Sequence, residues 1–196
     1  MFLDDLKTKD IILASGSPRR KQLLDALGIK FRIVIPDICE NYPPELEREK
    51  IALYLAVRKA ESVNNAEDDR QIIIASDTIV CIEDSVLNKP AGRKEAIQML
   101  RSLSGKDHYV ITAVCIASNV KKRSFYAETK VTFAELPDDD IEYYIDYYRP
   151  YDKAGSYGIQ EWIGYIGIEK IEGSYFNVMG LPVQRLYAEL KNFINE

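Results

Sequence analysis

The chain has one histidine and three cysteines among its 196 residues, which is too few for several kinds of site. A histidine-based catalytic triad would have to use His108, and neither a G-x-S-x-G elbow nor a Cys–His pairing supports one. Cys39, Cys81 and Cys115 are odd in number, widely spaced and without a C-x-x-C pair. This pattern argues against a disulfide framework and against zinc, and it favours a reduced, cytoplasmic protein. Any bound metal is expected to be a hard cation held by oxygen atoms.

The chain also lacks an excess of positive charge and any long apolar run. With 26 Lys and Arg against 31 Asp and Glu, its net charge is −5, which argues against binding a nucleic-acid polymer or an anionic membrane. No run reaches the length of a membrane span. The first residues, with Asp4 and Asp5, lack the basic region and apolar stretch of a signal peptide. A local basic pocket for a small anionic ligand remains compatible with this composition.

Predicted strands and helices alternate along the chain, which indicates an α/β fold formed by one domain over residues 1–196. Strands are expected at 11–14, 31–35, 71–83, 86–87, 109–118, 124–133 and 162–171. Helices are expected at 18–27, 45–64, 93–104, 137–148 and 181–194. The hairpin predicted between Tyr109 and Phe133 indicates that the sheet is mixed rather than purely parallel.

The first strand-to-helix turn, L-A-S-G-S-P-R-R at 13–20, has the composition of an anion site. Gly16 is expected to permit a tight turn, and Ser17 is expected to cap the helix that Pro18 begins. The free N–H groups and positive dipole of a helix start attract anions, and Arg19 and Arg20 add two cations. Ser15 supplies a further hydroxyl. Taken alone, this short pattern favours a capped turn with solvated arginines, so other residues must decide.

Asp77 is the most informative single residue of the sequence, because it interrupts an apolar strand. A carboxylate in such a strand must be paired, hydrogen-bonded or bound to a metal, since an isolated buried charge is very costly. Glu40, in a loop after a predicted strand, is the candidate for a second carboxylate, although its local sequence alone favours a plain surface acid. Two carboxylates with open water positions suit Mg²⁺ that substrate phosphates also hold.

Three lysines stand out by their surroundings, although most lysines are solvated surface groups. Lys59 lies near the end of the helix predicted at 45–64, Lys89 precedes a proline in a turn, and Lys153 precedes Ala154 and Gly155. Lysines beside small residues and turns can reach a phosphate as point charges.

Six motifs in order resemble the Maf family, which is named for septum formation. They are L-A-S-G-S-P-R-R at 13–20, S-D-T-I-V at 76–80, N-K-P at 88–90, L-S-G-K-D-H at 103–108, D-K-A-G-S-Y-G-I-Q at 152–160 and G-S-Y-F-N-V-M-G-L-P at 173–182. The resemblance spans residues 11 to about 190, and six ordered motifs are far more specific than one.

The resemblance implies a nucleoside triphosphate pyrophosphatase with the fold of inosine triphosphatases: a long mixed sheet, flanking helices, and two lobes with a nucleotide cleft between them. Water would attack the α-phosphorus with the help of Mg²⁺, or alternatively Mn²⁺. By position, Asp77 matches the proposed general base or metal carboxylate and Glu40 its partner. Ser15, Lys59 and Lys89 match phosphate- or metal-shell positions. A homodimer is also implied.

Within that family, Arg19, Thr78 and Gln160 resemble the branch that acts on dTTP and UTP. A glutamine amide offers a donor and an acceptor, which suits a uracil or thymine edge. The chain departs from this branch at Arg149, and again at Glu161 and Trp162 immediately after Gln160. These departures lie at the rim of the implied base pocket. Two other functions stay open: a related enzyme for modified nucleotides, and a non-hydrolysing nucleotide-binding regulator of cell division.

Overall fold

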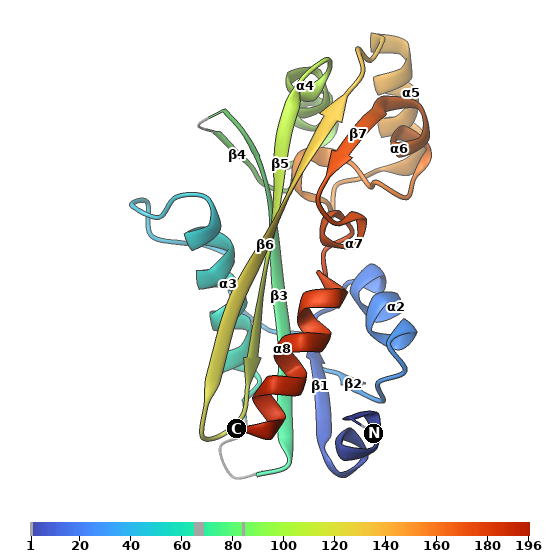
Figure 1. The fold of residues 1–196 in the computed structure, drawn as a ribbon. Helices are drawn as coiled ribbons and strands as arrows, with labels where there is room; N and C mark the ends of the chain where they lie inside the picture. Colours follow the sequence, from blue (N-terminus) through green and yellow to red (C-terminus); the bar gives the residue numbers. More distant parts are fainter. Residues whose placement is uncertain (1, 65–68, 84) are drawn as a thin grey trace. The chain divides into compact units, whose positions relative to one another are not determined.

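The computed structural model describes residues 2–64, 69–83 and 85–196, and these form a mixed seven-stranded sheet with helices (Figure 1). The strands are β1 (Asp10–Ala14), β2 (Arg32–Ile33), β3 (Gln71–Ile82), β4 (Ser85–Leu87), β5 (Asp107–Ala117), β6 (Lys122–Phe133) and β7 (Ile168–Glu172). Their order is β2-β1-β3-β5-β6-β7, and β4 pairs with β3. β1 pairs in parallel with β2 and β3, whereas the β3–β4 and β6–β7 pairs are antiparallel. The predicted mixed α/β sheet is therefore confirmed.

The chain divides into two compact units that share three long strands. The first unit comprises Met1–Asp77, Thr112–Ala127 and Gly180–Glu196, and the second comprises Thr78–Ile111 and Glu128–Met179. Helices of the first unit are α1 (Phe2–Asp5), η1 (Leu6–Thr8), α2 (Pro18–Ala26), α3 (Glu49–Ser62) and α8 (Val183–Asn195). Helices of the second unit are α4 (Arg93–Leu103), α5 (Asp138–Tyr148), η2 (Ala154–Ser156), α6 (Trp162–Gly167) and α7 (Tyr175–Val178). None of the helices among the described residues is long and apolar enough to cross a membrane.

The core of the first unit is built from buried strands and the apolar faces of two helices. In β1, every residue from Ile11 to Ala14 is buried. α8 buries Leu186, Leu190 and Phe193 at the spacing of one helical face. α3 buries three pairs of neighbouring residues along one stripe: Ile51, Ala52, Leu55, Ala56, Lys59 and Ala60. Lys59 therefore lies on the buried face of its helix, where a charge requires partners.

One predicted element is wrong: the segment 162–171 is not a single strand. Its first part is the helix α6, and only its second part is the strand β7. In α6 the buried residues Ile163 and Gly167 are four apart, which is helical spacing. Short apolar segments such as this one do not distinguish helix from strand by periodicity alone. The predicted strand at 31–35 is also shorter than expected, because only Arg32 and Ile33 are in strand conformation.

His108 is part of a buried aromatic cluster in the second unit and not of a catalytic triad. Its Nε2 is 2.7 Å from the hydroxyl oxygen of Tyr157, and its ring packs edge-on against Phe133 and Tyr157. Burial lowers the pKa of His108 from 6.5 to about 4, although the nearby charge of Asp107 opposes this shift. The folded protein therefore keeps His108 neutral at pH values where the unfolded chain protonates it.

This difference predicts a pH-dependent stability. As the pH falls from 6.5 towards 4, the unfolded chain binds a proton that folded His108 does not bind, so unfolding becomes more favourable. The loss is roughly 3 kcal/mol over this interval. Urea denaturation at pH 7, 5.5 and 4 should show a smaller decrease in unfolding free energy for His108→Gln than for the wild type. Parallel decreases for the two proteins would contradict this assignment.

Candidate functional site

The turn between β1 and α2 presents two serines at the start of a helix. Ser17 is the N-cap of α2, and its Oγ accepts a hydrogen bond from the backbone N–H of Arg20 at 3.5 Å. The N–H of Ser17 donates to the buried Ser15 Oγ at 3.1 Å. The predicted cap is confirmed. The predicted need for Gly16 is wrong, because its φ is not positive and an added Cβ would meet only Ile35, at an ordinary 3.6 Å.

Arg20 ties this turn to the segment before α8. Its Nε donates to the carbonyl oxygen of Gly180 at 2.9 Å, and its Nη1 donates to Ser15 Oγ at 3.4 Å. Burial lowers the pKa of Arg20, and the negative charges of Asp77 and Glu40 act in the opposite direction. The Arg20 guanidinium therefore lies within electrostatic reach of both predicted carboxylates.

A second cation, Lys59, joins those two carboxylates. Lys59 Nζ is 2.6 Å from Asp77 Oδ1 and 2.7 Å from Glu40 Oε1. The side chains of Lys59 and Asp77 are only 10% and 9% exposed, whereas that of Glu40 is 41% exposed. Because isolated buried charges are very costly, the buried Lys59 and Asp77 offset each other's charge. Asp77 is thus paired and hydrogen-bonded, as its place in an apolar strand predicted.

The loop that carries Glu40 is held by a residue that the sequence did not single out. Arg58 of α3 donates from Nη1 to the carbonyl oxygens of Cys39 and Asn41, at 3.1 and 3.2 Å. These bonds hold the backbone on both sides of Glu40 against the helix that carries Lys59. In the sequence, Arg58 is notable only as the neighbour of Lys59. Its position in a helix does not reveal which loop its side chain reaches.

The role of Gly180 was likewise not predicted, although Gly180 lies in the motif at 173–182. Its carbonyl oxygen accepts hydrogen bonds from Arg20 and from Ser76 Oγ, the latter at 3.3 Å. Gly180 has a φ of 107°, which favours glycine. This carbonyl therefore connects the β1–α2 turn with the strand residue that precedes Asp77.

Arg19, in the first turn of α2, is half-buried, and the remaining predicted site residues belong to the second unit. Thr78 is half-buried and Lys89 is exposed. The loop with Lys153 lies against the turn that contains Lys89, because the N–H of Gly155 donates to the carbonyl oxygen of Asn88 at 3.3 Å. Gly155 has a φ of 67°, which favours glycine, and an added Cβ would be 3.0 Å from Val80, so close packing also disfavours a side chain there.

Lys153 and Gln160 have different surroundings at the two ends of that loop. Lys153 is buried, and its Nζ is 2.8 Å from Asp152 Oδ1 and 3.1 Å from Glu161 Oε1. Gln160 Oε1 is buried and has no hydrogen-bond partner among the described residues. A buried acceptor without a partner is costly, so this oxygen suits a ligand that can donate a hydrogen bond.

The carboxylates of Asp77 and Glu40 suit a hard cation only if substrate or water supplies further oxygen ligands. The part of the chain that the structure describes holds no group of three or more His, Cys, Asp or Glu side chains arranged for a metal ion. Asp77 and Glu40 both direct a carboxylate oxygen at the same ammonium, so one small cation could contact both. Two carboxylates supplemented by substrate oxygens and water match Mg²⁺ chemistry.

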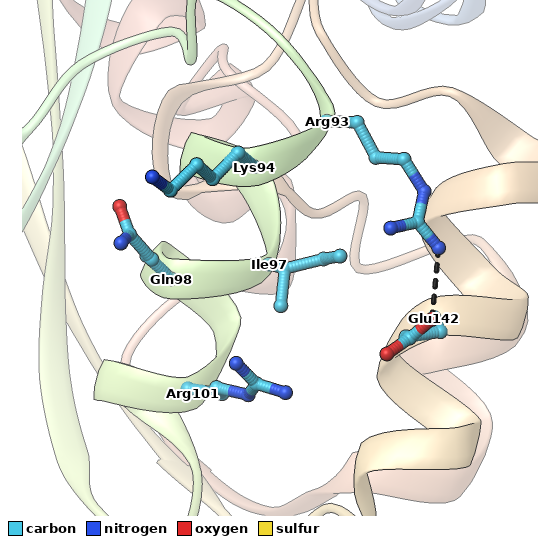
Figure 2. A pocket seen from close by; sticks show the side chains of 6 residues that line it. All are labelled: Arg93, Lys94, Ile97, Gln98, Arg101 and Glu142. Atoms are coloured by element: carbon cyan, nitrogen blue, oxygen red, sulfur yellow. Dashed lines mark hydrogen bonds and ion pairs between the residues drawn. The ribbon is translucent and has the colours of Figure 1, made fainter.

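A separate groove lies between α4 and α5, within the second unit. Its volume is about 380 Å³, and Figure 2 shows the six residues that line it: Arg93, Lys94, Ile97, Gln98, Arg101 and Glu142. Arg93 is paired with Glu142 at 2.9 Å, and Arg101 with Asp138 at 2.7 Å. None of the predicted site residues lines this groove, and its arginines already have carboxylate partners.

Comparisons with known proteins agree with the resemblance seen in the motifs. A family model described as Maf-like protein matches residues 10–193. A protein of Porphyromonas gingivalis (strain ATCC BAA-308 / W83) named dTTP/UTP pyrophosphatase is 54% identical over 195 residues, covering 98% of both chains. A protein of the same name from Phocaeicola vulgatus is 56% identical over 191 residues, covering 97% of this chain and 99% of that protein.

The fold agrees with a solved structure of low sequence identity. The Staphylococcus aureus Ham1 protein aligns with a TM-score of 0.50 and 14% identity, covering 92% of this chain and all of that chain. This likeness shows the shared fold alone. The family model and the full-length relatives show membership more strongly, because both extend over nearly the whole sequence. The chain belongs to the Maf-like protein family.

Proposed function

We propose that this chain hydrolyses dTTP and UTP to the nucleoside monophosphate and pyrophosphate. The observation that carries the proposal is the Lys59 ammonium between Asp77 and Glu40, within the electrostatic reach of Arg20. Convergent cations and carboxylates are the groups that phosphoryl transfer requires. The names of the full-length relatives support dTTP and UTP as substrates.

The triphosphate is proposed to bind at the start of α2. Backbone N–H groups there, together with the hydroxyls of Ser15 and Ser17, offer neutral donors to phosphate oxygens. Arg19 and Arg20 add positive charge that does not depend on pH in the physiological range. Because Gly180 and Ser15 accept hydrogen bonds from the Arg20 side chain, its fork is held in place before substrate binds.

Asp77 and Glu40 are the residues that would hold a divalent cation, and Mg²⁺ fits their oxygen donors. When bound, the cation would neutralise negative charge that develops on the phosphates. Lys59 engages Oδ1 of Asp77 and Oε1 of Glu40, and each carboxylate has a second oxygen. Both carboxylates are thereby aimed at one point.

The reaction is proposed to proceed by attack of water on the α-phosphorus. Asp77 would accept a proton from that water and orient its lone pair towards phosphorus. The P–O bond to the β-phosphate breaks as the new bond forms, and pyrophosphate leaves with the bonding electrons. Lys59 and Lys89 would stabilise the charge on the phosphate oxygens. Phosphoryl transfer of this kind needs positioning and charge neutralisation more than covalent help.

The base is proposed to be read by Gln160 and Thr78, with Lys153 on the same loop as Gln160. The buried Gln160 Oε1 lacks a partner, and uracil and thymine each present an N–H donor at N3. A hydrogen bond there would satisfy the oxygen and reject a base with an acceptor at this position. Thr78, a half-buried residue, carries a hydroxyl that would make a second polar contact.

The domain organisation, cellular location and oligomeric state are proposed as follows. Residues 1–196 are proposed to work as one pyrophosphatase domain, since β3, β5 and β6 contribute to both units. A cytoplasmic homodimer is proposed from the family resemblance. Action on modified nucleotides remains the second candidate, because Glu161 and Trp162 depart from the pyrimidine branch beside Gln160. A non-hydrolysing regulator is less favoured, since it would not need the buried carboxylate of Asp77.

Replacing Asp77, the proposed general base, tests the catalytic assignment. Asp77→Asn should lower kcat by roughly 10³-fold while nucleotide binding persists, because the amide cannot accept the proton of water. Lys59 keeps Glu40 as a partner in this variant, so the fold should survive with a lower Tm. The measurement is pyrophosphate release with UTP and Mg²⁺, with nucleotide binding followed by calorimetry. Asp10→Asn, which breaks a surface pair with Arg32 in the same unit, is the matched control. Wild-type turnover by Asp77→Asn would show that Asp77 is not the base.

The position of attack is open to isotopic measurement. Hydrolysis of UTP in oxygen-18 water should place the heavy oxygen in UMP, because the proposed nucleophile joins the α-phosphorus. Mass spectrometry of the two products decides between this result and label in pyrophosphate. Label found in pyrophosphate would mean attack on the β-phosphorus and would refute the proposed step.

A substrate panel separates the three candidate functions. Natural and modified triphosphates should each be incubated with Mg²⁺ while pyrophosphate and phosphate are both measured. The proposal predicts pyrophosphate alone and the highest kcat/KM for dTTP and UTP. Gln160→Leu should reduce that preference roughly tenfold, since it loses a bidentate amide contact. A higher kcat/KM for modified bases supports the second candidate, and binding without turnover supports the regulator.

A further inference from the structure

Glu161 connects three parts of the second unit through one carboxylate. It accepts a hydrogen bond from the hydroxyl of Tyr144 in α5 through Oε2, and its Oε1 is 3.1 Å from Lys153 Nζ. The Tyr144 hydroxyl oxygen in turn accepts a hydrogen bond from the N–H of Gly158 at 3.0 Å. We call Tyr144, Lys153, Gly158 and Glu161 the Glu161 network. It joins α5, the start of the loop 153–160 and the first residue after that loop.

The network lies largely in the interior, so the contacts among its members matter energetically. Tyr144 is fully buried, and the side chains of Lys153 and Glu161 are 9% and 20% exposed. A buried charge without a partner is costly, and removal of one partner leaves the other uncompensated. Lys153 also contacts Asp152, but that carboxylate is 61% exposed and therefore pairs in a more solvated setting. Glu161 is thus the main partner of Lys153 within the interior.

The backbone at Gly158 leaves room for the carboxylate of Glu161. A Cβ on Gly158 would lie 2.7 Å from the Glu161 carboxyl carbon, so the Glu161 side chain occupies the space that another residue would fill. The N–H of Glu161 donates to the carbonyl oxygen of Gly158 at 2.9 Å, and the Glu161 carbonyl oxygen accepts from the N–H of Gly164 at 2.8 Å. The main chain immediately beside Gln160 is therefore fixed by both the side chain and the backbone of Glu161.

Gln160 itself has no such support for its amide oxygen. Its Oε1 is buried without a hydrogen-bond partner in the described part of the chain. The location of that acceptor depends on the backbone that carries it, and the Glu161 network holds that backbone. A residue can determine specificity in this way without touching the substrate.

We propose that Glu161 is a positioning residue that sets the location of Gln160 and thereby the recognition of the pyrimidine base. This inference rests on the proposed function and deepens it. Lys153 acts in this arrangement as a tie between the loop and Glu161, because two carboxylates already offset its charge. The network acts on recognition of the base and not on the triphosphate or on the chemical step.

Two probes separate recognition of the base from recognition of the phosphates. UMP carries the base and one phosphate, whereas inorganic tripolyphosphate carries phosphates alone. Both should be tested as competitive inhibitors of UTP hydrolysis by the wild type, Glu161→Gln and Tyr144→Phe. Glu161→Gln keeps the size of the side chain and removes its charge. Tyr144→Phe keeps the ring and removes only the hydroxyl, so at least one variant retains the packing of the fold. Glu142→Gln, which lies in α5 outside the network, is the matched control.

Loss of one network contact should weaken inhibition by UMP roughly five- to tenfold in both variants, which is the usual effect of one hydrogen bond. Inhibition by tripolyphosphate and kcat should each stay within about twofold of the wild type, since the phosphates and the chemical step are untouched. Unchanged UMP inhibition in a folded variant would overturn the proposal. If inhibition by tripolyphosphate weakened as much as inhibition by UMP, the proposal would also be overturned, because Lys153 would then act on the phosphates. Failure of the proposed function would appear separately, as absence of hydrolysis by the wild type.

Discussion

One buried ammonium group organises the proposed site. Lys59 sits on the apolar stripe of α3 and contacts two carboxylates, one from β3 and one from the loop after β2. Ionised groups are stable in an interior only when they compensate each other, so the buried Lys59 and Asp77 require each other, and Glu40 reaches the same ammonium from a more exposed position. The same convergence gives two hard oxygen donors aimed at one point. Folding therefore assembles the groups that a cation and a triphosphate require.

Around this cluster, main-chain carbonyls position the side chains that carry charge. The Gly180 carbonyl joins Arg20 to Ser76, next to Asp77, and Arg58 holds the loop of Glu40 through two carbonyls. Such contacts fix the direction of long side chains before a ligand arrives, which lowers the entropy lost on binding. In the second unit an ion pair takes the place of the carbonyls, because buried Lys153 and Glu161 hold the loop of Gln160 in place.

Local sequence predicted those features that depend on neighbouring residues. An aspartate inside an apolar strand requires partners wherever that strand lies, and Ser17 before Pro18 predicts a cap from local geometry alone. Features that depend on distant contacts were not predicted. Arg58 and Gly180 act through loops far away in the sequence, and Glu161 meets Tyr144 only after folding. The segment of α6 was predicted as a strand because its short apolar run fits the periodicity of a strand as well as that of a helix. Only its packing in the folded chain selects the helix. Six ordered motifs indicated the family, since their combination is specific where each alone is not.

The central claim is that Asp77 and Glu40 converge on the cation that accompanies a bound triphosphate. A crystal structure of the wild-type protein with Mn²⁺ and a non-hydrolysable α,β-imido analogue of dUTP tests it directly, because Mn²⁺ is located by its anomalous scattering. The account predicts an anomalous peak at coordination distance from carboxylate oxygens of both Asp77 and Glu40, with the phosphates against the first turn of α2. A triphosphate bound elsewhere, with Lys59 still holding both carboxylates and no metal beside them, would contradict it.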